Sequence, residues 1–455
     1  MVKTIGIVHY KVGGTDGVSL EIDKWKTVLE DMGHKVHLCA GDLGQLEGTL
    51  IKELYHHLPD VERLNTNTYI KFGDYKDEVE YRAELEDLAE KIEEGLLNFV
   101  RQKGIDYLII ENLWSNATSP PATLAASRVV RSTGIPTLAH HHDFYWERVD
   151  GIALTNRTAL ELVEKNKPPR ISCIQNVVIN SLAQDELLAR KGISSSVIPN
   201  VFDFESDPWR PDEYNRDFRQ QLGFTEADVL ILQATRIMPR KGIELAFDFV
   251  NALNHPERRA GLEKQGLYDG RSFTKDSRIA LVLAGYTEDE ITGEYIKKLK
   301  RKRDETETDA VFIEDVIGGS RRSENGKKIF SLWDTYVYAD FVTYPSYWEG
   351  WGNQFLEALR AKLPLMLFEY PVYKADIEDK GFSVVSLGSE LADGEDGLVN
   401  VPARKIEEAA DQAIDLLADL SLREEVVESN FEIGRRHYSL DALSKYLQPL
   451  IDGSQ

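Results

Sequence analysis

Two glutamates and two glycines near residue 350 have the spacing of a loop that binds both a sugar and an anion. Glu349 and Glu357 stand eight positions apart, with Gly350 and Gly352 between them. The apolar run Ala339–Pro345 before them predicts a buried strand, so the order is strand, glycine turn and helix. Free N–H groups at the start of such a helix bind anions, and Glu349 in the loop can accept hydrogen bonds from hydroxyls. This combination indicates a nucleotide sugar as the ligand.

The same two carboxylates could also form the acid/base pair of a glycosidase. The loop-then-helix setting and a cationic turn earlier in the chain disfavour that reading. Glu357 lies two turns into the predicted helix, where it could meet a ribose. The alternative for Glu357 is an ordinary solvated helix residue.

The cationic turn is the segment Ala234–Gly242, which follows a predicted strand and precedes the predicted helix Ile243–Asn251. Arg236 stands at the end of the strand and Lys241 at the start of the helix. Two cations beside a helix N-terminus form a site for a diphosphate, although a solvated basic turn would have the same composition. The G-x-x-x-x-G-K-[ST] pattern of P-loops is absent, which argues against ATP hydrolysis.

A glycine-rich loop, Gly13–Ser19, joins the first predicted strand to the first predicted helix. Glycine lets the backbone approach a ligand closely, so we expect Gly14, Asp16 and Gly17 to line a substrate site. An ordinary turn before a helix would need glycine too. The G-x-G-x-x-G spacing is absent, which argues against a dinucleotide cofactor.

Three consecutive histidines, His140–His142, come at the end of the predicted strand Thr137–His140. Neighbouring residues of an extended chain point to opposite faces, and no carboxylate partner stands at a metal-binding spacing, so we expect no metal site. We expect His142 and Asp143 to offer imidazole and carboxylate groups to sugar hydroxyls. A mainly structural hydrogen-bonding role is the alternative.

The composition sets limits on partners and location. A chain of 455 residues exceeds one ordinary core and predicts two domains. The net charge of −23 argues against nucleic acid and anionic membranes as partners, because phosphate backbones need a basic footprint. No signal-peptide pattern or run of 18 apolar residues is present, and Cys39 and Cys173 lack zinc or C-x-x-C spacing. We expect a cytoplasmic protein without a membrane span.

Short apolar strands alternate with amphipathic helices, which predicts an α/β fold with parallel, doubly wound sheets. The strands predicted in the first half are Thr4–Tyr10, Lys35–Ala40, Tyr107–Glu111, Thr137–His140, Gly151–Thr155, Ile171–Ile174 and Ser196–Ile198. One long surface helix is predicted over Asn67–Arg101. Ser181–Gln184 is typical of a capping box before a helix over Asp185–Lys191.

The pattern breaks at Pro199–Phe204, which we interpret as the linker between the domains. The strands predicted after it are Val229–Thr235, Arg278–Ala284, Ala310–Ile313, Phe341–Tyr344, Pro364–Phe368 and Ser383–Val385. Two charged insertions, 254–275 and 287–308, are expected to face solvent, and two closing helices over about 403–420 and 430–450 are amphipathic. We predict a first domain of residues 1–202 with 431–455, a second of residues 203–430, and a binding cleft between them.

Together these motifs resemble the retaining glycosyltransferases of family 4, whose GT-B architecture has two Rossmann-like doubly wound domains facing across a cleft. The motifs that carry the resemblance are Pro345–Ser346 before the E-x7-E pair, Arg236 with Lys241–Gly242, the Pro199–Asn200 linker, the loop Gly13–Gly17, and His142–Asp143. They span almost the whole chain in the expected order.

The resemblance implies a role for each motif. Arg236 and Lys241 would bind the donor diphosphate, Glu349 would contact the transferred sugar, and Glu357 would contact the ribose. His142 would lie beside the sugar and the acceptor. The backbone at the start of the helix would help to hold the donor, through Gly352, Asn353, Gln354 and Phe355. The implied activity is transfer of a hexose, with retained configuration, from a nucleoside diphosphate sugar to a small hydroxylated acceptor, without cofactor or metal.

Three places depart from the family pattern. Lys362 stands where glycine is usual, Glu369–Lys374 replaces a Gly-Gly-x-x-Glu pattern, and Asn353–Gln354 replaces Leu-Pro. The runs Trp351–Gln354 and His140–Trp146 are most similar to the group that makes mannosylglucosylglycerate-type compatible solutes, which implies a glucosylglycerate-like acceptor.

Several alternatives stay open at this point. The donor base, GDP or UDP, is undecided, and so is homo-oligomer formation. A nucleotide-sugar epimerase or hydrolase would share the architecture, and a non-catalytic nucleotide-sugar sensor would share the binding groups.

Overall fold

The computed structural model describes residues 2–14, 16–147, 151–285, 293–324, 326–394 and 396–453. Contacts within the chain divide it into two compact units, unit 1 (Met1–Val201 with Leu440–Gln455) and unit 2 (Phe202–Ser439). The sequence placed the return to the first domain at residue 431. The division falls nine residues later because helix α14 (Leu420–Tyr438) lies wholly within unit 2 and α15 (Leu440–Asp452) begins after it.

Unit 1 is built on a seven-stranded sheet in the order β3-β2-β1-β4-β5-β6-β7, and all its strand pairs are parallel. Its strands are β1 (Thr4–Lys11), β2 (Lys35–Asp42), β3 (Thr49–Leu50), β4 (Tyr107–Glu111), β5 (Thr137–His141), β6 (Ile174–Val178) and β7 (Ser196–Val197). Its helices are α1 (Gly17–Asp31), α2 (Pro59–Tyr69), α3 (Glu78–Lys103), α4 (Pro120–Thr133), α5 (Arg157–Asn166), α6 (Ser181–Lys191) and α15. The strand order reverses between β1 and β4.

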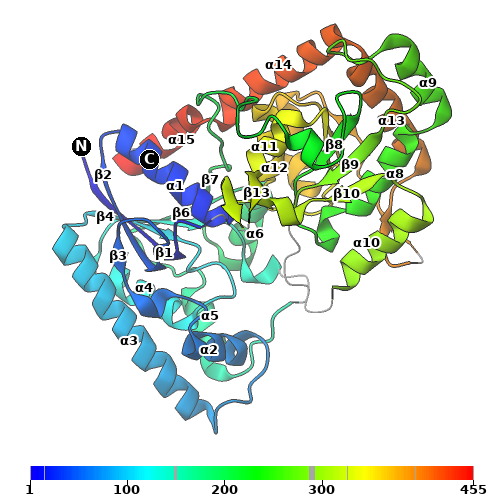
Figure 1. The fold of residues 1–455 in the computed structure, drawn as a ribbon. Coiled ribbons are helices and arrows are strands. Elements are labelled where there is room, and N and C mark those ends of the chain that lie inside the picture. Colours follow the sequence, from blue (N-terminus) through cyan, green and yellow to red (C-terminus); the bar gives the residue numbers. More distant parts are fainter. Residues whose placement is uncertain are drawn as a thin grey trace. The chain divides into compact units, whose positions relative to one another are not determined.

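Alternating side chains of the central strands bury two separate cores, one on each face of the sheet. Val8 and Ile110 point to the face covered by α3 and α4, whereas Ile7 and Ile109 point to the face covered by α1 and α15. This period of two, with both faces apolar, is what a parallel strand covered by helices requires. Figure 1 shows α3 as the long helix of this unit.

Two helix predictions in unit 1 are wrong, and capping side chains explain both. The expected helix over Asn67–Arg101 is divided between α2 and α3, because the Asn67 side chain accepts hydrogen bonds from the N–H groups of Gly73 and Asp74 and Asp77 caps the new helix. Helix α6 begins at Ser181 and is capped by Asn180, whose side chain accepts from Ala183 N at 2.7 Å.

The strand expected at 151–155 is absent, since this described segment has no regular structure and its Ala153 N–H donates to the carbonyl of Tyr69. The strand expected at 171–174 instead begins at Ile174, the first residue of β6.

Unit 2 contains a six-stranded sheet in the order β10-β9-β8-β14-β15-β16, with parallel pairs throughout. These strands are β8 (Val229–Gln233), β9 (Ile279–Leu283), β10 (Ala310–Phe312), β14 (Phe341–Tyr344), β15 (Leu365–Leu367) and β16 (Val385–Ser386). Smaller pairings join β11 (Ile317–Gly318), β12 (Arg322–Glu324) and β13 (Lys327–Ser331), and also β17 (Ala392–Asp393) and β18 (Val399–Asn400). The helices are α7 (Phe218–Gln221), α8 (Ile243–Leu253), α9 (Pro256–Gln265), α10 (Glu294–Glu305), α11 (Leu332–Tyr338), α12 (Asn353–Arg360), α13 (Ala403–Ala418) and α14.

Helix α8 is almost wholly buried and packs against β9 and α13, so it forms the centre of one layer of unit 2. The insertion at 254–275 contains α9, which contacts α13. The insertion at 287–308 contains α10, while its first residues lie outside the described part of the chain. Among the described residues, no helix is both long and apolar enough to cross a membrane.

Candidate active site

The candidate site of unit 2 lies where the strand order of its sheet reverses, between β8 and β14. Ligands of open parallel sheets bind beyond the carboxyl ends of the strands at such a reversal. The cationic turn leaves β8 and the glycine loop leaves β14, and the two strands pair directly, with Phe341 opposite Ile231. The fold therefore brings together two motifs that are more than 100 residues apart in the sequence.

A buried ion pair joins the two motifs. The ammonium group of Lys241, at the end of the short 3-10 turn Pro239–Lys241, contacts the carboxylate of Glu349. Arg240 Nη1 donates to the same carboxylate at 2.7 Å and to the carbonyl oxygen of Trp348 at 3.0 Å. Glu349 is only 8% exposed. Arg240 was not among the residues expected here from the sequence.

The charges at this point favour an additional anion. Burial acts to raise the pKa of Glu349, but the charges of Lys241 and Arg240 outweigh it and lower this pKa to about 2. Burial lowers the pKa of Lys241, the charges of Arg240 and Arg236 act in the same sense, and Glu349 opposes them. Two cations thus contact one ionised carboxylate, the charge of Arg236 acts on Lys241, and the positive excess can stabilise a diphosphate.

Two glycines in left-handed backbone conformations allow the close approach of these segments. Gly242 has a φ of +57°, and a Cβ there would lie 2.5 Å from the carbonyl oxygen of Pro345. Gly352 has a φ of +122°, and a Cβ there would lie 2.5 Å from the hydroxyl of Tyr370 and 2.7 Å from that of Tyr344. Any other residue would push the cationic turn or the glycine loop away from its partner.

The start of α12 carries buried polar groups that make no hydrogen bond within the described structure. These atoms are Trp351 Nε1 and both side-chain polar atoms of Gln354. Buried polar groups are normally paired, so their presence beside a helix N-terminus indicates a place for a polar ligand. Phe355 was expected to help hold the donor through its backbone. Its N–H instead donates to the carbonyl of Gly352, and its side chain is fully buried.

Two other expected residues of this helix have distinct surroundings. Asn353 begins α12 and is half-buried. Glu357 is half-buried about one turn along, and the hydroxyl of Tyr336 donates to Glu357 Oε2 at 2.6 Å. That hydrogen bond holds the carboxylate in one orientation, as a hydroxyl-binding group requires.

In unit 1 the equivalent reversal of strand order lies between β1 and β4. The glycine loop follows β1, but Thr15 within it lies outside the described residues. Asp16 caps α1: its carboxylate accepts from Ser19 N at 3.1 Å and pairs with Lys11 at 3.2 Å. A Cβ at Gly14 would lie 2.9 Å from Asp16 Oδ2, and Gly17 is the first residue of α1. Asp16 therefore shapes the loop through its own hydrogen bonds.

A buried carboxylate, Glu111, joins two of the three histidines. His140 Nδ1 and His142 Nε2 lie 3.0 and 3.1 Å from Glu111 Oε2, and all three side chains are buried. The fold thus supplies a carboxylate partner that no local spacing in the sequence indicated. Glu111 ends β4, which pairs with β5 so that Glu111 stands opposite His140. A carboxylate at the end of the buried run Tyr107–Glu111 was the sequence signal for this contact.

Although both imidazoles contact Glu111, their pKa values are shifted in opposite directions. Burial lowers the pKa of His140, and the nearby His142 adds to that effect. For His142, burial acts in the same direction, but the hydrogen bond and charge of Glu111 outweigh it and raise the pKa. The pKa of Glu111 itself is well below its usual range, because the imidazoles outweigh its burial. His142 is therefore the most readily protonated histidine of this group.

The three ligand atoms lie within 4.8 Å of one another, so the group is of a kind that could hold a metal ion. Both imidazole nitrogens, however, approach one carboxylate oxygen at ordinary hydrogen-bond distances. Hydrogen bonding accounts for the arrangement of this carboxylate and the two imidazoles.

Asn112, which follows Glu111, fixes the loops after β4 and β5. It has a φ of +57°, a conformation that asparagine tolerates better than most residues. Its side chain accepts from His142 N at 3.1 Å and donates to Asp143 Oδ1 at 3.0 Å. His141 points elsewhere, with Nε2 3.1 Å from Asn176 Oδ1. His142 and Asp143 are thus held by one side chain, that of a residue that the sequence analysis did not single out.

Comparison with solved structures identifies the fold. A sucrose-phosphate synthase from Thermosynechococcus elongatus is 12% identical, with 99% of this chain and 98% of that chain covered and a TM-score of 0.59. The Anabaena protein HepE, solved in complex with UDP-glucose, is 13% identical, with 99% of this chain and 100% of that chain covered and a TM-score of 0.57. These matches over nearly the whole chain show that the fold is that of a GT-B glycosyltransferase.

Sequence comparison then gives the family. The model described as "Glycosyl transferases group 1" matches residues 215–432. A mannosylglucosylglycerate synthase from Petrotoga mobilis is 40% identical, over 91% of this chain and 93% of its own length. Another, from Thermotoga maritima, is 41% identical, over 97% of this chain and 98% of its own length. The chain belongs to the group 1 glycosyl transferases and is a hexosyltransferase.

Proposed function

We propose that the protein transfers a mannosyl group from a nucleoside diphosphate sugar to a glucosylglycerate-like acceptor, with retention of the anomeric configuration. The observation that carries this proposal is the similarity, over more than nine-tenths of the chain, to two proteins named mannosylglucosylglycerate synthase. The names of these relatives supply the sugar and the acceptor class.

The residues of unit 2 would hold the donor. Lys241, Arg240 and Arg236 provide the positive charge that a leaving diphosphate needs as its bond to the sugar breaks. Glu349 is ionised and oriented by two of these cations, so it can accept a hydrogen bond from a sugar hydroxyl. The ribose would meet Glu357, whose orientation is fixed by a tyrosine hydroxyl.

We propose front-face transfer, in which the departing phosphate takes the proton of the acceptor hydroxyl. The pairing of Glu349 with Lys241 and Arg240 supports this route, because two ion pairs weaken a carboxylate as a nucleophile. The chain's part in the reaction is then to position the two substrates and to stabilise the leaving diphosphate. We further propose that no metal or cofactor takes part, since fixed cations occupy that role.

The direct test is incubation of the purified protein with glucosylglycerate and either GDP-mannose or UDP-mannose. A product heavier than the acceptor by one hexose is expected in mass spectra, with the configuration of the donor in ¹H NMR. Mannose release at the same rate without acceptor would indicate a hydrolase, and conversion of the donor to an isomer would indicate an epimerase. Binding of the donor with none of these reactions would indicate a sensor. Each of these results would overturn the proposal.

A further inference from the structure

A pocket in unit 1 is lined mostly by cationic side chains. These residues lie far along the sequence from the glycine loop. The volume of the pocket is about 670 Å³, a size common for small-molecule sites. Six of its ten lining residues are cations and one is a carboxylate, Glu164. The cations are Arg128, Arg131, Lys165, Arg170, Arg190 and Lys191. This cluster of six cations occurs in a chain whose net charge is −23.

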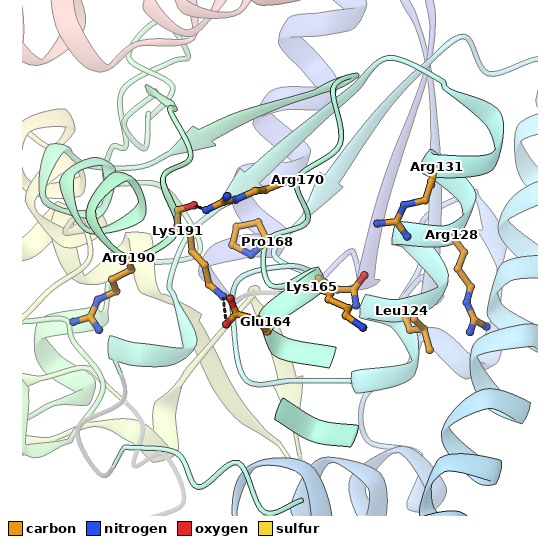
Figure 2. A pocket seen from close by; sticks show the side chains of 10 residues that line it. Leu124, Arg128, Arg131, Glu164, Lys165, Pro168, Arg170, Arg190 and Lys191 are labelled. Atoms are coloured by element: carbon orange, nitrogen blue, oxygen red, sulfur yellow. Dashed lines mark hydrogen bonds and ion pairs between the residues drawn. The ribbon is translucent and has the colours of Figure 1, made fainter. Parts of the chain in front are cut away.

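The fold, and not a basic run in the sequence, assembles these cations. They come from the last turns of α4, α5 and α6 and from the segment that leads into β6 (Figure 2). Two of these cations lie beside the loop that follows β5: Lys191 Nζ is 5.8 Å from the centroid of the Tyr145 ring, and the guanidinium of Arg190 is 5.5 Å from that of Trp146. The residues that line the pocket do not include Glu111, His142 or Asp143.

Helix ends and neighbouring carboxylates account for only part of this charge. Each of three helix C-termini carries about half a negative charge, which attracts cations. Arg128 pairs with Glu86 at 2.6 Å, Arg190 pairs with Glu186, and Lys191 lies 3.8 Å from Glu164. Lys165 lies 3.9 Å from Glu161.

Two guanidinium groups are left without a carboxylate partner among the described residues. Arg131 has no hydrogen bond or ion pair in that part of the chain, and Arg170 donates to the backbone carbonyl of Lys191. Figure 2 places Arg131 and Lys165 on one side of Pro168, and Arg170 with Lys191 on the other. Burial lowers the pKa of Lys191, and the charge of Arg170 adds to this effect. The pocket therefore holds positive charge that its own carboxylates do not balance.

The geometry points to a binding site for a small, multiply charged phosphate compound, which we propose as a second ligand of this protein. Guanidinium groups bind phosphate oxygens in pairs, and two of them at one pocket suit a diphosphate or a bisphosphate. An extended polyanion is disfavoured, because beyond a screening length of about 8 Å it would meet the negative charge of the rest of the chain.

Inorganic pyrophosphate is the probe for this site. Because pyrophosphate could also bind at the donor site, the experiment has to distinguish binding at the two sites. Titration calorimetry is carried out on the full chain as wild type, as Lys241→Ala, and as Lys241→Ala combined with Arg131→Ala and Arg170→Ala. We expect Lys241→Ala to retain pyrophosphate binding at one site, and the triple variant to lose affinity there by at least about tenfold, the effect of removing charge-assisted hydrogen bonds. Both arginines are exposed, so folding should persist, which circular dichroism checks.

Arg190→Ala in the Lys241→Ala background is the matched control, because this arginine is paired with Glu186. It should change the affinity less than threefold. Absence of pyrophosphate binding to Lys241→Ala, or equal affinity with and without Arg131 and Arg170, would overturn the proposal. Tighter binding of a 20-nucleotide single strand than of pyrophosphate, lost in the triple variant, would also overturn it by showing a different class of ligand. Since transfer activity is not the readout, the result is independent of the proposed reaction.

Discussion

Replacing Lys241 by Met tests whether one buried ion pair supports both the stability of unit 2 and the transfer reaction. Methionine keeps most of the side-chain volume and removes the ammonium group. Glu349 is then left with its contact to Arg240, at 2.7 Å, and without its contact to Lys241. The carboxylate stays buried, so the loss of charge compensation should be measurable.

The size of the effect follows from the titration of Glu349. Its pKa is lowered from 4.5 to about 2, and each unit corresponds to about 1.4 kcal/mol, so its surroundings favour the ionised form by about 3 kcal/mol. Removing one of the two contacting cations should therefore lower the free energy of unfolding at pH 7 by about 2–3 kcal/mol. The leaving diphosphate also loses a cation, so kcat/KM should fall by about 100- to 1000-fold.

Urea unfolding and initial rates of transfer measure the two effects. Lys374→Met, which removes an exposed lysine paired with Glu378, is the control and should change neither quantity appreciably. The double variant Lys241→Met/Glu349→Gln should regain most of the stability, because no unpaired charge is then buried, but none of the activity. A Lys241→Met variant that transfers within fivefold of wild type, or a double variant no more stable than Lys241→Met, would refute the reasoning.

Four further outcomes are expected. Glu349→Gln should lower kcat more than it raises KM. Glu357→Gln should mainly raise the KM for the donor, because a ribose contact is the same in the ground and transition states. Equal effects of the two substitutions on kcat and KM in steady-state kinetics would contradict these roles. The depressed pKa of Glu349 stabilises the fold above about pH 4.5, and this contribution is lost as the pH falls toward about 2, so acid unfolding of Glu349→Gln should lack that component. Glu111→Gln should lower the pKa of His142 in an NMR titration, since the raised pKa depends on that carboxylate. An unchanged midpoint would show that another group raises the pKa of His142. Transfer should survive EDTA or fall only a few-fold, and full loss restored by one divalent ion would instead assign a metal to the group formed by Glu111 and the two histidines.

The sequence predicted most of the fold because buried parallel strands leave a strong pattern. The runs that became β4 and β14 are mostly apolar and are buried at every position, so their type and place were evident. The break between α2 and α3 was missed because helical periodicity continues across it. The deciding interaction is the hydrogen bonding of Asn67 to the backbone of a turn six residues later, which periodicity does not record.

The candidate site could be predicted as a set of segments but not as a set of contacts. Lys241 and Glu349 were assigned to one site, yet their direct pairing depends on β8 and β14 being neighbours, which follows from strand order and not from spacing. Arg240 stands beside Lys241, and only the short turn at Pro239–Lys241 decides that both side chains meet one carboxylate. Glu111 was recognisable in principle, as a charge at the end of a buried strand.

The return of the chain to unit 1 has a consequence for the order of folding during synthesis. Leu443, Leu447 and Ile451 of α15 complete the core that includes Trp25 and Val28 of α1. All of unit 2 is translated between these two helices, which takes roughly 10–50 s at usual elongation rates. Until then, one apolar face of unit 1 is incomplete on the ribosome. Truncation after residue 439 should therefore yield a chain that aggregates or binds chaperones, even though every residue of both candidate sites is present.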